Sequence, residues 1–283
     1  GALIHEISGT AIPHEIPGVK EVHAVDAAGV HPLLLAVGSE RYTPYLKNKR
    51  PAEILTQANR ILGTGQLSLA KYLFIAADEK KELNCHDVKS FFKYIFERID
   101  LTRDLHFQTK TSIDTLDYSG SGLNEGSKLV VACYGEKIRE LSNEIPASIV
   151  RWDFVSKPFM LMEGVLALQM GEFTSYSQVS KDIRVLADKI ALSTHEFKGI
   201  VQIVLYNDFV FEQHNNLLND YVWITYTRSN PSADVYGVNE STENKHWGCT
   251  GPMIIDARKK PHHAPELKME AAVEERIARI NFF

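Results

Sequence analysis

The apolar positions of this chain predict strands and helices in alternation. In the first half, an alternating segment (19–25) has the pattern of a half-buried strand, and two continuous apolar runs (32–37 and 72–77) have that of strands buried on both faces. Apolar residues at helical spacing predict helices at 51–62 and 87–99, and the second of these carries an aromatic stripe.

The second half repeats this order. Residues 149–155 correspond to the first strand, 175–192 to the first helix, 200–205 to the central strand and 217–227 to the aromatic helix, and a strand at 252–256 closes the half. Strands that alternate with helices predict an α/β fold, a layered α/β/α arrangement with a mostly parallel or mixed sheet. Two such units either share one continuous sheet or pack face to face, and the pattern leaves both arrangements open.

Single residues also recur at a constant separation of 130 positions. The recurring pairs are Asp78 with Asp208, Arg98 with Arg228, Asp104 with Asp234, Phe91 with Tyr221, and Leu62 with Leu192. A solenoid module has roughly 20–50 residues, so this longer repeat indicates that a whole α/β unit is duplicated. Residues kept in both copies are expected to build the scaffold, and a residue found in one copy is a better candidate for chemistry.

The pattern divides the chain into four segments. We expect a linking helix at 1–16, broken by Pro13, then a first unit at 17–140, a second at 141–264 and a helical tail at 265–283. The tail has the spacing of an amphipathic C-terminal helix, with an apolar stripe formed by Met269, Val273, Ile277 and Ile280. Such a stripe has to be buried on this chain or on a partner, which favours a homo-oligomer.

Composition narrows the class of protein. Hydrophobic residues make up 44% and charged residues 24%, and the net charge of −5 argues against a nucleic-acid-binding surface. No apolar run approaches the roughly 20 residues that span a bilayer, and no signal peptide is expected. Three widely spaced cysteines without a CxxC pair favour a reducing cytoplasm. Because the chain begins with Gly1 rather than Met, we expect a fragment of a longer protein.

Common catalytic motifs are missing. His246, Cys249, His262 and His263 lie within eighteen residues, but no pair has zinc-ligand spacing, so no metal site is expected there. There is no GxSxG sequence, and Gly63-Thr-Gly65 matches neither a dinucleotide fingerprint nor a Walker loop.

Two sets of charged residues have clearer interpretations. Lys71 precedes a buried strand after a Gly-rich turn, whereas the second copy has Val201 there, so a role in phosphate binding competes with a Lys that extends to the strand edge. Arg98 with Asp104 and Arg228 with Asp234 recur in both copies with six-residue spacing. Their recurrence favours structural ion pairs that fix the helix–strand turn over a catalytic role.

Several segments together resemble a known family. In the first copy they are Lys71-Tyr-Leu-Phe-Ile-Ala-Ala-Asp78, Asp87-Val88, Glu97-Arg98-Ile-Asp-Leu-Thr-Arg-Asp104 and Gly126-Ser-Lys128, and in the second they are Thr227-Arg-Ser-Asn-Pro-Ser-Ala-Asp234 and Gly251-Pro-Met-Ile-Ile-Asp-Ala-Arg-Lys259. They resemble the C-terminal domain of UbiD-type decarboxylases, the 3-polyprenyl-4-hydroxybenzoate carboxy-lyases. Residues 2–25 resemble the helix and strand that join the family's flavin-binding barrel to this domain, and the second copy suits a long form.

The resemblance implies a non-oxidative decarboxylase for aromatic or α,β-unsaturated acids. Such enzymes use prenylated FMN, whose phosphate is held with a divalent metal and potassium, and the cofactor carries the difficult chemistry. It also implies that Lys71 lies near the cofactor phosphate. The family's Glu-x-x-Gly-Pro-x-Gly-Glu segment and its flavin-binding barrel are absent from residues 1–283, so no catalytic residue and no bound cofactor are expected in this fragment.

The resemblance therefore assigns the chain a supporting role. It would close the substrate pocket and oligomerise, and it would be inactive without the missing N-terminal flavin-binding part. The expected pathway is ubiquinone or menaquinone biosynthesis, with a polyprenyl hydroxybenzoate or a naphthoate as substrate, in a cytoplasmic protein that approaches the membrane for a prenylated substrate. The alternative is a non-catalytic duplicated α/β module used for assembly or ligand binding.

Overall fold

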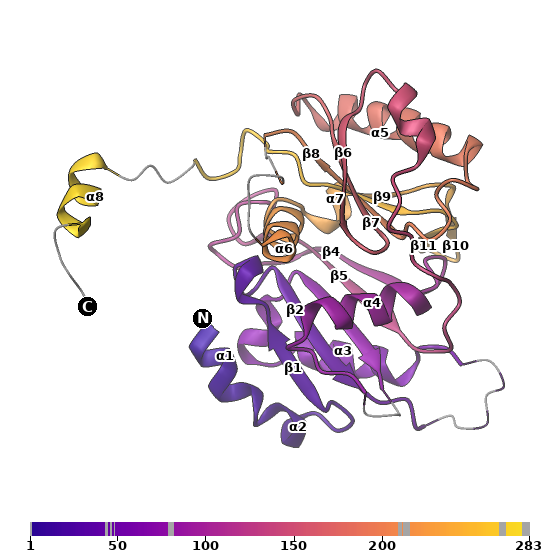
Figure 1. The fold of residues 1–283 in the computed structure, drawn as a ribbon. Coiled ribbons are helices and arrows are strands. Elements are labelled where there is room, and N and C mark those ends of the chain that lie inside the picture. The colour runs from indigo at the N-terminus through magenta and orange to yellow at the C-terminus, as the bar shows by residue number, and fades with distance from the viewer. Residues whose placement is uncertain are drawn as a thin grey trace.

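The computed structural model contains two α/β units that pack against each other (Figure 1). It describes residues 2–42, 45, 47, 49–78, 82–208, 211, 216–265 and 270–278. Each unit has a five-stranded sheet of its own. The predicted α/β class is confirmed, and of the two arrangements that the sequence left open, the face-to-face one is observed.

The first sheet is mixed. Its strands, in spatial order, are β1 (Glu21–Ala24), β2 (Leu33–Gly38), β3 (Tyr72–Ala77), β5 (Glu125–Cys133) and β4 (Leu105–Ser112). The central strands β2, β3 and β5 are parallel, and the edge strands β1 and β4 run antiparallel to their neighbours. Leu35 of β2 pairs with Phe74 of β3, which in turn pairs with Val131 of β5.

The second sheet has the same order and the same strand directions. Its strands are β6 (Ser156–Met162), β7 (Val165–Gln169), β8 (Gln202–Tyr206), β12 (Met253–Asp256) and β9 (Val235–Gly237). Here too the three central strands are parallel and the two edge strands are antiparallel. This strand-by-strand correspondence confirms the internal duplication that the 130-residue recurrence predicts.

Helices form three layers around the two sheets. In the outer layer of the first unit, α2 (Ile12–Glu15) and α3 (Glu53–Leu62) pack on its sheet, α1 (Ala2–Gly9) lies against β1, and in the second unit α5 (Tyr176–Leu192) forms the outer layer. The middle layer consists of α4 (Val88–Arg98) and α6 (Leu217–Thr227), and Figure 1 shows α6 between the units. Pro13 occupies one of the first positions of α2, where its missing N–H costs no hydrogen bond, so the break between the first two helices comes before it.

The middle layer is one hydrophobic core that both units build. Phe92 of α4 stacks with Tyr226 of α6 at a centroid distance of 6.1 Å and meets Tyr221 edge-on at 5.7 Å. Tyr226 also contacts Tyr72 of β3 edge-on at 4.9 Å. These separations are typical of favourable aromatic pairs. Continuous apolar runs are needed in the central strands because alternate residues face this shared layer and the outer helices.

The predicted strand at 149–155 is wrong. Residues Ala147–Arg151 form a 3₁₀ helix (η3), and the first strand of the second unit is β6 at Ser156–Met162. The buried residues Ile149, Trp152 and Val155 recur every third position, which fits a tight helical turn better than a strand. The true edge strand contains Pro158 and two register shifts, so its sequence lacks the alternation of a regular strand.

Shorter elements complete the fold. They are the 3₁₀ helices η1 (Asp26–Ala28) and η2 (Gly65–Leu69), α7 (Pro231–Asp234), the hairpin strands β10 (Glu240–Glu243) and β11 (His246–Cys249), and α8 (Ala271–Ala278). The predicted tail helix is present in α8, where Val273 and Ile277 are 40% and 51% exposed. The other two stripe positions, 269 and 280, lie outside the described residues. Among the described helices, none has both the length and the apolarity to cross a bilayer.

Candidate functional site

Lys71 lies in a buried ion pair directly before β3. Its Nζ is 2.6 Å from Asp117 Oδ2 and donates a hydrogen bond of 2.6 Å to Ser119 Oγ. Only 1% of the residue is exposed. Burial lowers the pKa of Lys71, and the negative charge of Asp117 opposes that shift. The ammonium therefore already has a counter-charge within the chain, and it does not extend to the strand edge.

A second lysine lies beside this pair. Lys128 of β5 donates to the carbonyl oxygens of Ser68 and Ala70, each at 2.8 Å. Burial lowers its pKa to about 8, opposed by the charge of Asp117. Both lysines hold the turn before β3 to its neighbours, so the contacts of Lys71 and Lys128 are those of scaffold residues.

The structure places Arg98 and Arg228 beside other carboxylates than the predicted Asp104 and Asp234. Arg98 lies 3.1 Å from Glu97 and over the ring of Tyr94 at 3.8 Å. Helical side chains point back toward the helix N-terminus, so Arg98 extends over the preceding turn and away from the one that follows. Its counterpart Arg228 pairs instead with Asp208, at 2.5 Å.

The two aspartates nevertheless have the same role in both copies. Asp104 Oδ2 accepts the backbone N–H of Asp100 at 2.9 Å, and Asp234 Oδ2 accepts that of Asn230 at 2.7 Å. Both side chains are fully buried. Each carboxylate thus closes its own turn, and the duplicated feature is this backbone cap.

The cations that neutralise these aspartates differ between the copies. Asp104 is 2.6 Å from the half-exposed Arg103, whereas Asp234 is 3.3 Å from the fully buried Lys260. Burial raises the pKa of Asp234 to about 6, against the opposing charge of Lys260. Removal of one partner would therefore leave a more deeply buried unpaired charge in the second copy than in the first.

The turn of the second copy also contacts the first unit. Ser127 Oγ of β5 donates to Asn230 Oδ1 at 2.5 Å and accepts from Ser232 N at 2.8 Å. Tyr72 and Ser229 are joined through their hydroxyl groups at 2.7 Å. In the reverse direction, Cys249 N of β11 donates to Leu101 O at 3.1 Å. Polar contacts across the interface are therefore concentrated at the two duplicated turns.

The histidine-rich segment 246–263 does not gather into a metal-binding group in the part of the chain that the structure describes. The ring of His246 lies 5.2 Å from that of His106, and His262 lies 5.0 Å from His263. Burial raises the pKa of the Cys249 thiol to about 12, which keeps it protonated at neutral pH.

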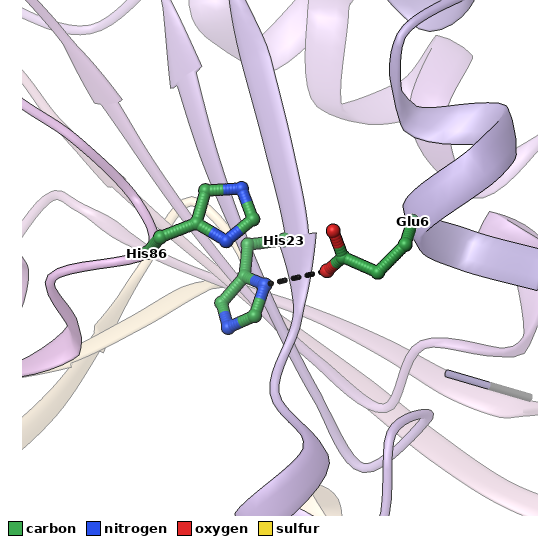
Figure 2. Close-up of side chains that lie close together, drawn as sticks. All are labelled: Glu6, His23 and His86. Atoms are coloured by element: carbon green, nitrogen blue, oxygen red, sulfur yellow. Dashed lines mark ion pairs between the residues drawn. The ribbon is translucent and has the colours of Figure 1, made fainter. Parts of the chain in front are cut away.

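A different group of potential ligands comes together at the edge of the first sheet. Figure 2 shows Glu6 of α1, His23 of β1 and His86, which lies just before α4. His23 Nδ1 is 3.6 Å from Glu6 Oε1, and the two imidazole rings are 4.2 Å apart between centroids. Glu21 lies next to them, with Oε1 3.8 Å from His86 Nε2. Glu6, Glu21 and His86 line a pocket of about 240 Å³.

Sequence reasoning missed this group. Its members come from three segments separated by 17 and 63 positions, and such spacings match no local ligand motif. The one available signal is His23, a titratable residue at a half-buried polar position of a strand. Only the packing of α1 and of the segment before α4 against β1 brings the three side chains together.

Comparison with known proteins finds a family match in the first half of the chain. Residues 1–133 match the family model of the 3-octaprenyl-4-hydroxybenzoate carboxy-lyase C-terminal domain. A 4-hydroxybenzoate decarboxylase subunit from Chlamydia pneumoniae is 29% identical over 278 residues, which cover 98% of this chain and 43% of that protein. An uncharacterized protein of Chlamydia trachomatis serovar D is 30% identical over 278 residues, with coverage of 98% and 44%. The chain therefore spans less than half the length of these relatives.

Solved structures give weaker similarity. The open form of vanillic acid decarboxylase from Sedimentibacter hydroxybenzoicus is 14% identical, with a TM-score of 0.38 over 51% of this chain and 30% of that one. The UbiD-class enzyme HmfF from Pelotomaculum thermopropionicum, in complex with FMN, is 16% identical, with a TM-score of 0.36 and the same coverage. The family match over residues 1–133 agrees with the resemblance seen in the sequence, and this part of the chain is similar to the C-terminal domain of the 3-octaprenyl-4-hydroxybenzoate carboxy-lyases.

Proposed function

We propose that this chain is the C-terminal part of a UbiD-type decarboxylase, a carboxy-lyase that removes the carboxyl group of an aromatic acid. The observation that carries the proposal is the match of residues 1–133 to the carboxy-lyase domain. The relative from Chlamydia pneumoniae that is named as part of a 4-hydroxybenzoate decarboxylase supports it, since its similarity extends across both units. A polyprenyl hydroxybenzoate or a naphthoate of quinone biosynthesis is the proposed substrate class.

In this proposal, the flavin is held by another part of the longer protein. The cofactor implied by the family is prenylated FMN with a divalent metal and potassium. The described residues do not fit its phosphate at Lys71, because Asp117 already neutralises that ammonium and only 1% of the residue is exposed. A contact with phosphate would require Asp117 to move away. The two units therefore serve the site by closing the pocket over the substrate and by assembling the oligomer, in a cytoplasmic protein.

The test compares the longer protein with this chain. Both are purified with prenylated FMN, Mn²⁺ and K⁺, and ¹³CO₂ release is followed from carboxyl-labelled 4-hydroxybenzoate, its prenylated derivative and a hydroxynaphthoate. We expect turnover by the longer protein and none by residues 1–283. Turnover by residues 1–283 alone would contradict the assignment of the flavin to another part. Absence of turnover by the longer protein on all three acids would contradict the decarboxylase.

The second candidate is a non-catalytic module for assembly or ligand binding. The packing favours it in one respect, because the charged residues singled out from the sequence all have scaffold contacts. The reading frame upstream of Gly1 distinguishes the two candidates. A glutamate-rich Glu-x-x-Gly-Pro-x-Gly-Glu segment supports the decarboxylase, and its absence supports the module.

A further inference from the structure

Three separate elements bring two imidazoles and one carboxylate to the same point at the edge of the first sheet. Glu6 lies on α1, His23 on β1 and His86 before α4, and one ligand atom from each lies within 4.8 Å of the other two. Figure 2 shows the Glu6 carboxylate facing the Nδ1 edge of His23, with the ring of His86 next to that of His23. The three residues are far apart in the sequence, so only the folding of the chain brings them together.

The spacing of the atoms suits a shared ion better than a direct hydrogen bond. His23 Nδ1 is buried and has no hydrogen-bond partner, and its 3.6 Å separation from Glu6 Oε1 exceeds hydrogen-bond range. A buried polar atom without a partner is costly. Two atoms that each lie about 2.1 Å from one tetrahedral ion are themselves about 3.4 Å apart. The observed separation is close to that value.

The chemistry of the group also favours a cation. His23 and His86 each offer an imidazole nitrogen, and Glu6 offers a carboxylate oxygen. Cys85 could join His86 and Glu21 in another group of ligands, but Cys85 is fully buried and its backbone N–H is already held by Glu21. Two nitrogen ligands and one oxygen ligand match the preference of zinc and related transition ions.

We propose that Glu6, His23 and His86 bind one divalent transition-metal ion of the Zn²⁺ class. Glu21 supports the site from outside the ligand set, because its Oε2 accepts the backbone N–H of Cys85 at 2.7 Å and thereby holds the segment that presents His86. The adjoining pocket of about 240 Å³ leaves room for a water molecule or an external ligand at a fourth position. The ion joins α1 to the sheet edge and to the segment before α4.

The experiment measures zinc binding to the full chain, free of any affinity tag and treated first with EDTA. We expect isothermal titration with ZnCl₂ to show one equivalent bound in wild-type protein. His23→Gln and His86→Gln are each expected to weaken binding about 10-fold or more, whereas His14→Gln, an exposed histidine on α2, leaves it unchanged. Because Glu6 is on the exposed side of α1, Glu6→Gln should weaken binding without loss of the fold.

Two further readouts keep the test independent of folding defects. Far-ultraviolet circular dichroism checks each variant, and Co²⁺ should give the visible absorption of a tetrahedral site in wild-type protein and lose it in His23→Gln. Zinc at about 100-fold excess over its Kd should raise Tm by about 5 °C in wild-type and His14→Gln protein only. The proposal is overturned if no zinc binds, or if folded His23→Gln and His86→Gln proteins bind it as tightly as wild type.

Discussion

Asp104 and Asp234 each accept a backbone N–H from the residue four positions earlier. Their recurrence at a separation of 130 residues agrees with a scaffold role, and the cations beside them are Arg103 and Lys260. Sequence spacing places an arginine near a turn, and it does not say in which direction the side chain extends from its helix. Interactions that depend on side-chain direction are therefore harder to predict than the positions that carry them.

Substitution of these residues should lower the free energy of unfolding by an amount that increases with the burial of the charge left unpaired. Asp234→Asn leaves the buried Lys260 without its carboxylate, so we expect a loss of about 3–5 kcal/mol in the free energy of unfolding at pH 7.5. Asp104→Asn leaves the half-exposed Arg103 and should cost about 1–3 kcal/mol. Arg98→Met should cost less than about 1 kcal/mol, because its partner Glu97 keeps a second cation, Lys137, at 3.1 Å. Urea denaturation measures the free energy of unfolding of all three variants. Equal losses for Arg98→Met and Asp104→Asn would support an ion pair between Arg98 and Asp104.

Lys71 gives a second prediction at the residue scale. Lys71→Met strands the carboxylate of Asp117, whose side chain is 4% exposed, and should cost about 3–5 kcal/mol. Adding Asp117→Asn should recover part of that loss, since the stranded charge is removed. The matched control is Lys49→Met, which breaks an exposed pair with Glu136 and should change stability by less than about 1 kcal/mol. Equal costs for Lys71→Met and the control would show that the buried pair is not structural.

At the scale of elements, sequence patterns predicted the buried strands, the edge strand β1 and the long helices, and they missed the edge strand β6 and the hairpin of β10 and β11. Strands β3 and β8 are visible as apolar runs because both of their faces are covered. The edge strand β6 and the hairpin of β10 and β11 have no such run, since one face or both remain open to solvent. The group of Glu6, His23 and His86 was missed for a different reason, because it exists only where α1, β1 and the segment before α4 meet in space.

We expect the contact between the hairpin and the first unit to be sensitive to acid. His106 of β4 lies beside His246 of β11, and burial, followed by the charge of His246, lowers the pKa of His106 to about 4. The unfolded chain binds a proton near pH 6.5, whereas the folded chain resists it down to about pH 4. The stability from neutral His106 is thus present above pH 6.5 and lost as the pH falls from 6.5 to 4.

His106→Gln should make stability less dependent on pH in that window. We expect the variant to take up about one proton fewer than wild type on unfolding at pH 5, as measured from the pH dependence of the unfolding free energy. His14→Gln, at an exposed position, should leave the slope unchanged. An unaltered slope in His106→Gln would mean that this histidine is not held neutral.

The tail helix α8 carries a prediction about assembly. Val273 and Ile277 are 40% and 51% exposed, so the described part of the stripe is not buried on this chain. If the tail serves oligomerisation, truncation after Pro265 should lower the mass measured by light scattering. Val273→Ser combined with Ile277→Ser should have the same effect without shortening the chain. An unchanged mass in both variants would argue against an assembly role.

At the scale of the whole molecule, the shared middle layer determines whether either unit can fold without the other. Phe74 and Phe92 of the first unit pack with Tyr221 and Tyr226 of the second in a single core. The duplication and the fold class could be predicted from sequence, because each repeat carries its own pattern. The face-to-face packing could not, since an apolar residue looks the same whether it covers its own sheet or the other unit.

Separation of the units tests this dependence. Residues 1–140 or 141–283, produced alone, would expose the aromatic middle layer to water, so we expect neither to show cooperative unfolding or a dispersed amide spectrum. Mixing the two halves should restore both properties. Cooperative unfolding of either half by itself would contradict a core that needs both units.

The covalent connection between the two units removes a constraint that separate chains face. When two identical chains associate about a two-fold axis, every substitution at the contact appears twice, and each surface must complement itself. Here the two sides lie in one polypeptide, their encounter is intramolecular, and dilution cannot separate them. Each copy can therefore change alone, and one copy buries the charged Lys71 at a position where the other buries the apolar Val201. Fusion into one polypeptide therefore permits the two copies to differ in sequence, so one copy can specialise while the other keeps its structural role.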